Sequence, residues 1–585
     1  MGQGVTSRSV LFRCIGTAAV LLAASSTVSA LTVGTVVWGF DGTVVPGRMN
    51  LLSVELVNDS SRAFDGTVTL EKSDGLQRLG ARLEQDCFLA PGGIRWVQFH
   101  THNRQENEDW LLRWRGGSQT LSSPRVGPPA TVVLNDPDDP LAPRTVLKGF
   151  REDLFPVTAA ATDGLHAVVL DHAPRWEPVR RHAFLDWLRR GGTVHLLLNH
   201  RTGYHPEFGA DLDVLNTPGS RFRVGAGLVV RHVVARQKLT EKTLTQAAPA
   251  AELVEGDNIW QGGAEQAFFG RLSAFNRPRH LWGLIYLIVG CYILLIGPLN
   301  YVLGKRWRHW RPTLILFLAL VTGTSFLLEW LGRRGHHEAA AVHTVGIARP
   351  VGPDEYDVTL WVNAFVTRGR TYTVRHETAH GLYSTCQETE SVNGVIGGGT
   401  FVVDMPLYSS RAFVCRGVMK GPDLGLRVVN WPLEGSSKAD GLTLAHGPGF
   451  PTGVLGMWVR AGDRVYPMRE NREGLLVTTT AYGTDLDEFT SEDNPYRRVR
   501  GPFYEETDGP VDPRESYREM SKMLIGSGTG RGLQTFHHVR TPLPDDCVQF
   551  FVMAPCPEGF MICGNPFGRE TGYVMYQVCL FKPAQ

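Results

Sequence analysis

The chain has 585 residues, too many for one hydrophobic core, and at roughly 100 to 200 residues per domain it should fold as several domains. Its 59 Lys and Arg residues balance 58 Asp and Glu residues, and a formal net charge of +1 argues against a nucleic-acid-binding protein. Only 20% of the residues are charged, whereas glycine (65) and proline (35) are frequent, which favours short strands and turns over long surface helices.

The amino terminus has the pattern of an export signal. Arg8 and Arg13 precede an apolar run over 14–24, and small residues follow at 28–30. The run is too short to cross a bilayer comfortably, so residues 1–30 are predicted to be a signal peptide that is cleaved after its last residue. An uncleaved anchor or a lipid-modified start is the alternative.

Residues 31–125 are predicted to form a β-sandwich. Apolar and polar side chains alternate over 52–56 and 94–99, which is the period of half-buried strands. The segment Val-Glu-Leu-Val-Asn-Asp at 54–59, followed by Gly-Thr-Val-Thr-Leu at 66–70, resembles the Ig-like domains of envelope proteins. A sandwich of another topology is the alternative.

Residues 130–240 alternate between strand and helix patterns, which predicts a parallel sheet. Strands are expected at 131–134, 167–170 and 193–198. A helix is expected over 178–192, between a proline at its start and a glycine pair at its end. This part is therefore predicted to be an α/β domain.

The string Phe-Leu-Asp-Trp-Leu-Arg-Arg-Gly-Gly-Thr-Val-His-Leu-Leu-Leu-Asn at 184–199 resembles a helix and strand of class I glutamine amidotransferase-like domains. That resemblance implies a flavodoxin-like parallel sheet. Enzymes of the family use a cysteine nucleophile on a sharp strand-to-helix turn, with a histidine base nearby. Because no cysteine occurs between Cys87 and Cys291, the domain is expected to lack the nucleophile and to bind or support other parts.

Two apolar stretches, 281–303 and 312–332, are each near the ~20 residues that cross a bilayer as a helix, and they follow a linker at 241–280. They are predicted to be transmembrane helices. The short loop 304–311 carries four basic residues, which favours the cytoplasmic side, but basic residues at the outer ends nearly balance them. The predicted signal peptide decides the orientation, because a translocated amino-terminal part makes this loop cytoplasmic.

The first apolar stretch contains Ile-Gly-Pro-Leu-Asn-Tyr-Val-Leu at 296–303, followed by the basic loop. This motif resembles bacterial membrane proteins of uncharacterised activity that combine an Ig-like β-sandwich, an amidotransferase-like domain and a two-helix membrane hairpin. Gly297 and Pro298 are expected to loosen the helix, and Asn300 offers a polar side chain to a neighbour. A kinked span and a functional polar site are the two interpretations.

Residues 340–585 are predicted to be a β-rich extracytoplasmic domain. Apolar side chains alternate over 358–364, strand patterns recur near the end of the chain, and one short helix is expected around 514–524.

Within this part, the segment His376-Glu377-Thr378-Ala379-His380 matches the zinc motif H-E-x-x-H. The motif works on a helix, where both histidines share one face and the glutamate activates bound water. Here strand-forming residues precede it and a glycine follows it, and only Glu388 or Glu390 could supply a third ligand nearby. No metal site is assigned, and His376, Glu377 and His380 stay minor candidates.

Three other groups of residues could carry chemistry. His336, His337 and His343 could bind a metal but are expected in a solvated linker, and the three aspartates of 136–139 end a parallel strand, where an acidic surface turn is expected. The cysteines outside the signal and the apolar stretches could form disulfides or remain free buried thiols, and none has a C-x-x-C zinc pattern. These cysteines are Cys87, Cys386, Cys415, Cys547, Cys556, Cys563 and Cys579.

Together these features predict a non-enzymatic, membrane-anchored cell-envelope protein that binds or scaffolds through extracytoplasmic domains. We expect no catalytic residue and no cofactor. The expected partners are the lipid bilayer and other envelope proteins, and nucleic acid is not expected. The expected location is the cell membrane, crossed twice, with the amino- and carboxy-terminal domains periplasmic. A membrane-bound zinc metallopeptidase that uses 376–380 is one alternative, and an accessory subunit of an envelope transport or assembly complex is another.

Overall fold

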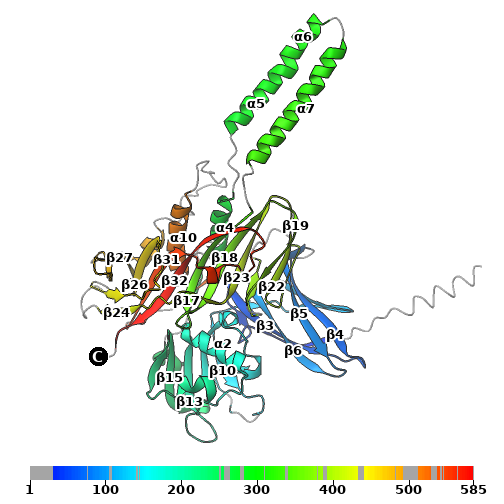
Figure 1. Ribbon diagram of the computed structural model, residues 1–585. Coiled ribbons are helices and arrows are strands. Elements are labelled where there is room, and N and C mark those ends of the chain that lie inside the picture. Colours follow the sequence, from blue (N-terminus) through cyan, green and yellow to red (C-terminus); the bar gives the residue numbers. More distant parts are fainter. Residues whose placement is uncertain are drawn as a thin grey trace, which may run out of the picture.

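The computed structural model describes residues 31–583 apart from several short stretches. These stretches are 75–76, 104–107, 140–142, 144, 249–251, 256–263, 277–281, 308–309, 336–339, 378–379, 386–391, 432–440, 481, 492–511, 529–536, 541–542, 545 and 563. The predicted signal peptide, 1–30, lies outside the described residues. The protein is multidomain and rich in strands, with several sheets, a few helices and two long apolar helices (Figure 1).

The amino-terminal part consists of two antiparallel sheets that enclose a core. One sheet has the order β1 (Thr32–Trp38), β3 (Arg48–Val57) and β6 (Ile94–Asn103). The facing sheet contains β5 (Gln77–Leu89), β4 (Phe64–Asp74), β7 (Asp109–Trp114) and β8 (Gly117–Leu121). Side chains from both sheets, such as Val54 and Leu112, are fully buried between them. A short ladder of β2 (Thr43–Val44) and β9 (Arg125–Val126) lies beside them. The period-two pattern therefore predicted these strands correctly, and the inward side chains of 52–56, 97 and 99 are buried, but Ile94, at the start of β6, is 64% exposed.

The second of these sheets continues into the carboxy-terminal part of the chain. Its seven strands have the order β19 (Arg370–Arg375), β22 (Thr400–Met405), β21 (Gly394–Gly397), β5, β4, β7 and β8. The junction is a parallel pairing in which Val395 lies opposite Arg82 and Ile396 opposite Leu83. Chain segments on either side of the apolar helices thus share one sheet.

The middle part is the predicted α/β unit. Its sheet has the order β11 (Gly149–Arg151), β10 (Ala130–Asn135), β12 (Leu165–Leu170), β13 (Thr193–Leu198), β15 (Gly227–Ala235) and β14 (Arg221–Val224). All pairings are parallel except that of the edge strand β14. Helix α2 (Pro178–Arg189) packs Phe184 and Leu188 on one face, and α3 (Glu241–Ala247) packs Leu244 on the other. The expected strands and helix are all present.

The apolar helices form an antiparallel hairpin that projects from the rest of the protein (Figure 1). Its first arm joins α5 (Trp282–Leu294), a π-turn (Leu295–Leu299) and α6 (Asn300–Arg306), and its second arm is α7 (Trp310–Gly335). The segments Gly283–Arg306 and Trp310–Glu329 are long and apolar enough to cross a membrane, and neither is buried against other parts. Pro298 lies inside this π-turn. A proline has no backbone N–H to donate, so the regular α-helical hydrogen bonds are interrupted there.

The carboxy-terminal part is organised by a twelve-stranded sheet. Its order is β20 (Leu382–Ser384), β23 (Ser409–Lys420), β18 (Glu355–Val366), β17 (Ala341–Pro350), β32 (Arg569–Phe581), β31 (Cys547–Pro555), β26 (Gly456–Ala461), β27 (Arg464–Glu470), β28 (Leu476–Thr478), β25 (Thr443–Ala445) and β24 (Arg427–Asn430), with β29 (Thr484–Asp485) beside β27. A two-stranded ladder joins β16 (Glu252–Glu255) to β30 (His537–Arg540). The predicted β-rich character of this part is thus observed.

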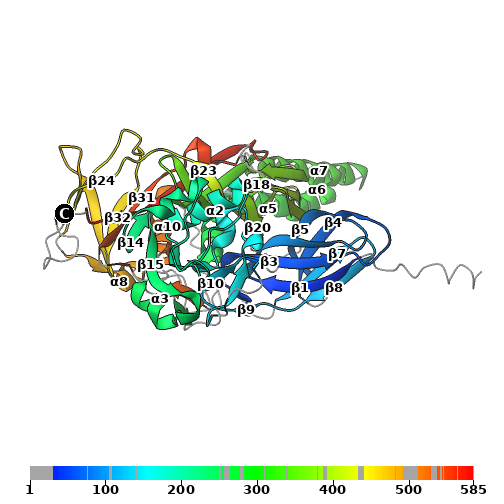
Figure 2. The ribbon, with the colours of Figure 1, turned by 90° about the horizontal axis from the view of Figure 1, so that it is seen from below.

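One face of the twelve-stranded sheet is covered by two different structures along its length. Helices α4 (Ala264–Ala274) and α10 (Pro513–Gly528), with the short α8 (Leu486–Ser491), pack Phe268, Met520 and Leu524 on the half near the hairpin. The α/β unit lies at the end away from the hairpin, as Figures 1 and 2 both show. Helix α10 is the one expected around 514–524.

Candidate functional site

The carboxyl ends of the parallel strands gather charged side chains. From β10 the chain continues to β11 on one side of the sheet, whereas from β12 it continues to β13 on the other side. The strand order thus reverses between β10 and β12, and in open α/β sheets ligands usually bind at the carboxyl ends of the strands beside such a reversal. Glu152 follows β11, Asp171 and His172 follow β12, His200 follows β13 and Arg236 follows β15.

His172 lies between two carboxylates in this crevice. Its Nδ1 is 2.9 Å from Asp171 Oδ1, and its Nε2 is 2.8 Å from Glu152 Oε2. Burial by itself lowers the pKa of His172, but the hydrogen bonds to both carboxylates outweigh it and raise that pKa to about 9. Arg236 Nε lies 3.2 Å from Asp171 Oδ2, and despite burial these contacts lower the pKa of Asp171. The imidazole between these two carboxyl groups is therefore a cation at neutral pH.

The aspartates of 136–139 divide between solvent and this network. Asp138 is exposed and pairs with Arg175 at 2.7 Å. Asp139 is more buried and pairs with His200 Nε2 at 3.2 Å and with Arg201 at 2.5 Å. The segment is an acidic turn, as expected, but its last carboxylate belongs to the network. These charged groups thus pair with one another across the carboxyl edge of the sheet.

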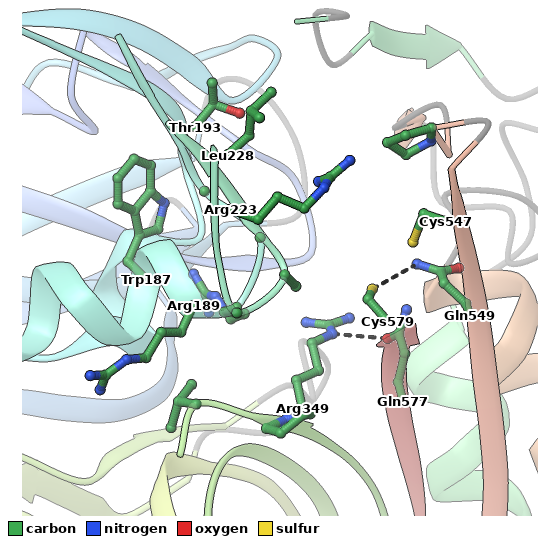
Figure 3. A pocket seen from close by; sticks show the side chains of 18 of the residues that line it. Trp187, Arg189, Thr193, Arg223, Leu228, Arg349, Cys547, Gln549, Gln577 and Cys579 are labelled. Atoms are coloured by element: carbon green, nitrogen blue, oxygen red, sulfur yellow. Dashed lines mark hydrogen bonds between the residues drawn. The ribbon is translucent and has the colours of Figure 1, made fainter. Parts of the chain in front are cut away.

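A cavity of about 1050 Å³ lies at the opposite, amino-terminal edge of the same sheet, where it faces the twelve-stranded sheet (Figure 3). We call it the arginine pocket. Seven arginines line it from all three parts of the protein: Arg48, Arg189, Arg190, Arg221, Arg223, Arg349 and Arg460. The lining contains two carboxylates, Asp163 and Asp546. Two of the arginines also pair with carboxylates outside the lining, Arg189 with Asp186 and Arg190 with Asp357.

An ion cluster joins the α/β unit to the twelve-stranded sheet at one side of the pocket. Arg190 Nη1 lies 2.9 Å from Asp163 Oδ1 and 2.7 Å from Asp357 Oδ2. Arg416 Nη2 lies 2.8 Å from Asp357 Oδ2 and also pairs with Asp163. All four side chains are at most 10% exposed, so two shared carboxylates hold two guanidinium groups away from water.

The remaining arginines crowd this cluster with further positive charge. Burial, together with Arg349 and Arg190, lowers the pKa of Arg48 to about 10. Burial and Arg48 lower the pKa of Arg416 to about 9, and burial and Arg190 lower the pKa of Arg349. Like charges disfavour one another in a poorly solvated place, and an anion between them would relieve that repulsion.

The opposite wall consists of strand ends whose side chains are fixed by hydrogen bonds. Arg349 Nε donates to Gln577 Oε1 at 2.9 Å, and Arg460 Nη1 donates to Gln549 Oε1 at 3.2 Å. Arg223 pairs with Asp546 at 2.9 Å, and its guanidinium carbon lies 3.9 Å from the centre of the Phe581 ring. Apolar side chains, Trp187 and Leu228 among them, complete the lining. The pocket can thus hold an anion that also has an apolar body.

Sequence patterns alone do not predict this pocket, because its arginines are spread along the chain from Arg48 to Arg460 and come together only in the folded protein. A signal does exist in the strands. The face of β31 that carries Phe551 and Met553 continues through Gln549, and the face of β17 that carries Ile347 continues through Arg349. Where the inward side chains of a strand change from apolar to polar toward its end, those polar side chains are candidates for lining a pocket.

The segment 376–380 is not helical at its described positions. His376 directly follows β19, and Glu377 and His380 are exposed. The His376 ring lies between two glycines, since a Cβ atom would come within 2.2 Å of its Cγ at Gly381 and within 2.6 Å of its Nε2 at Gly417. Over the described part of the chain, no three His, Cys, Asp or Glu side chains are placed to hold a metal ion. The possible third ligands, Glu388 and Glu390, lie outside it.

The other candidate residues are placed as follows. His343 lies within β17 rather than in a linker, with Nδ1 3.0 Å from Thr571 Oγ1. His336 and His337 fall outside the described residues, as do Cys386 and Cys563. The cysteines with described positions are free thiols: Cys87, Cys291, Cys415, Cys547, Cys556 and Cys579.

No protein-family model and no curated protein matches this chain. Among solved structures, a cycloisomaltooligosaccharide glucanotransferase of Paenibacillus sp., complexed with cycloisomaltoheptaose, is 19% identical over 23% of this chain and 20% of its own, with a TM-score of 0.15. The alkylpurine DNA glycosylase AlkC of Pseudomonas fluorescens, bound to DNA containing an abasic site analog, is 13% identical over 20% of this chain and 37% of its own, with a TM-score of 0.13. Both similarities cover well under two thirds of those proteins.

Proposed function

We propose that the protein is a non-enzymatic, membrane-anchored cell-envelope component that binds an anionic ligand in the arginine pocket. The observation that carries this proposal is the convergence of seven arginines on one cavity lined by two carboxylates. Guanidinium groups bind carboxylate and phosphate in a bidentate manner. The cavity volume of about 1050 Å³ leaves room for an anion with two or more charged groups.

We also propose that residues 31–125 form an Ig-like domain and that 130–240 form a class I glutamine amidotransferase-like domain without a nucleophile. Two facing antiparallel sheets support the first assignment. For the second, numbering β10, β11, β12, β13 and β15 as 1 to 5 gives the order 2-1-3-4-5, which is that of flavodoxin-like sheets. With no cysteine between Cys87 and Cys291, binding is the role that we assign to this domain.

The proposed location is the cell membrane, with 281–303 and 312–332 as spans, the loop 304–311 cytoplasmic, and both flanking parts periplasmic. The sheet that joins β5 to β21 supports a common side, because strands before and after the hairpin can pair only in one compartment. The proposed partners are the lipid bilayer and other envelope proteins.

The ligand proposal is tested on the full-length protein in mild detergent, with pyrophosphate and citrate as anionic probes, glucose as a neutral probe and spermidine as a cationic probe. Both anions should raise the melting temperature in a saturable way, and added salt should weaken the effect. Arg349→Gln and Arg223→Gln should weaken anion binding by about tenfold or more, since each removes a charged hydrogen-bond donor. Arg472→Gln, which changes an exposed arginine in a turn, should not. Equal responses to all four probes, or equal losses in all three variants, would overturn the proposal.

A further inference from the structure

Two cysteines lie side by side on the pocket wall. In the antiparallel pair of β31 and β32, Cys547 lies opposite Phe581 and Gln549 opposite Cys579. Both cysteines therefore occupy the same face as diagonal neighbours, and both line the arginine pocket. Figure 3 shows both sulfur atoms on the same side of the two strands.

The two thiols differ in their surroundings. Cys547 is 4% exposed, whereas Cys579 is partly open to the pocket. Gln549 Nε2 donates to Cys579 Sγ at 3.9 Å, and Arg460 fixes the orientation of that amide by donating to its oxygen. Arg349 approaches from β17 beside Gln577, as Figure 3 shows. An amide donor and nearby guanidinium groups are the surroundings that stabilise a thiolate.

The electrostatics agree with this difference. The hydrogen bond from Cys547 lowers the pKa of Cys579 most, and despite burial Gln549, Arg349 and Arg223 lower it further. The same contact and burial raise the pKa of Cys547. By contrast, burial raises the pKa of Cys415 to about 12, as expected for an inert core thiol. Cys579, which is the more exposed thiol and accepts from Gln549, is thus the one placed to react first.

We propose that Cys579 and Cys547 form a redox-active pair that exchanges with anionic disulfides bound in the arginine pocket. This inference rests on the proposed anion-binding role of the pocket and names a ligand class for it. A small disulfide that carries carboxylates fits both the guanidinium lining and the position of the thiols.

The chemistry balances within the pocket. The Cys579 thiolate attacks one sulfur of the disulfide R–S–S–R, which forms a mixed disulfide and releases one thiolate. Cys547 then loses its proton to that thiolate and attacks Cys579 Sγ, which releases the second thiolate. This second thiolate takes up the proton that Cys579 gave to solvent when it ionised, and so becomes the second thiol. The protein loses two electrons and two protons, and the bound disulfide becomes two thiols. The reverse sequence reduces the Cys547–Cys579 disulfide with two anionic thiols.

The test compares three disulfides of different charge on the reduced full-length protein: oxidised glutathione, 2-hydroxyethyl disulfide and cystamine. Alkylation and peptide mass mapping follow Cys547 and Cys579. For each reagent, the rate of reaction with the folded protein is divided by its rate with a denatured sample. At low salt this ratio should be about tenfold or more higher for oxidised glutathione than for cystamine, and the difference should shrink as salt is added. Equal relative rates for the three reagents would overturn the link to the pocket.

The variants separate the roles of the two thiols. Cys547→Ser should accumulate a glutathione adduct on Cys579, because no second thiol resolves it, whereas Cys579→Ser should leave Cys547 unmodified. Cys556→Ser, at a buried cysteine in the same part of the protein, serves as the control and should react like the unchanged protein. If pyrophosphate stabilises the protein but neither thiol exchanges, the anion pocket stands and the redox pair is refuted.

Discussion

Asp163 and Asp357 link the α/β unit to the twelve-stranded sheet. Asp163 belongs to the α/β unit and Asp357 to the twelve-stranded sheet, and each pairs with Arg190 and Arg416. Buried charges are tolerated only when they are paired, so these carboxylates fix the two parts against each other. The same pairing keeps Arg190 in the pocket wall, which couples the geometry of the site to the contact between the two parts.

His172 gives the protein a pH dependence that can be measured. Its folded pKa of about 9 lies above the ordinary value of 6.5, so its stabilising contribution is complete below pH 6.5 and is lost as the pH rises through 9. At its largest the contribution should be ~3 kcal/mol. Urea denaturation of the unchanged protein should therefore show a fall in the free energy of unfolding between pH 6.5 and 9.5.

The variants His172→Gln and His182→Gln check this assignment. His172→Gln should be less stable at pH 6.5 and should show a much smaller fall over the same pH range. His182, an exposed residue on α2, does not contact the network, so His182→Gln should keep the full fall. An unchanged pH dependence in His172→Gln would show that other groups cause it.

Among the helices and strands, the sequence predicts those whose formation depends on residues close together in the chain. The strand at 193–198 and the helix that begins at Pro178 were readable because each has a continuous apolar run or stripe with a proline or glycine at its end. The pairing of β21 with β5 was not readable, since more than 300 residues separate Leu83 from Ile396 and side-chain periodicity does not name a partner strand. The arginine pocket was missed for the same reason.

The junction between β5 and β21 can be tested at Gly397. A Cβ atom at this position would lie 2.8 Å from the backbone oxygen of Glu84, so the two strands would have to move apart. We expect Gly397→Ala to lower the free energy of unfolding by about 1–3 kcal/mol and to expose this edge to proteolysis. Gly209→Ala is the matched control, because nothing lies within 4 Å of a Cβ atom there. Equal stability of both variants would show that the junction tolerates separation.

For the whole molecule, the hairpin and the shared sheet together restrict the topology. The two arms are antiparallel neighbours, so the chain leaves and re-enters the strand-rich body at the same end of the hairpin (Figure 1). The α/β unit lies at the end of that body opposite the hairpin. The arginine pocket, which the α/β unit helps to line, is therefore also far from the hairpin. If the hairpin lies in a membrane, as proposed, the pocket is on the part of the body that is farthest from it.

The proposed topology can be tested by labelling single engineered cysteines on either side of the hairpin and between its arms. Asp65→Cys lies before the hairpin, Arg472→Cys after it and Arg311→Cys at the turn between its arms, and all three positions are exposed. A membrane-impermeant maleimide added to intact cells with a permeable outer layer should label the first two above the background of the native cysteines. It should label Arg311→Cys only after the membrane is permeabilised. Labelling of Arg311→Cys in intact cells, with protection of the other two, would reverse the orientation. Labelling of only one flanking position would contradict a sheet shared across the hairpin, because both strands of the β5–β21 pair must lie in one compartment.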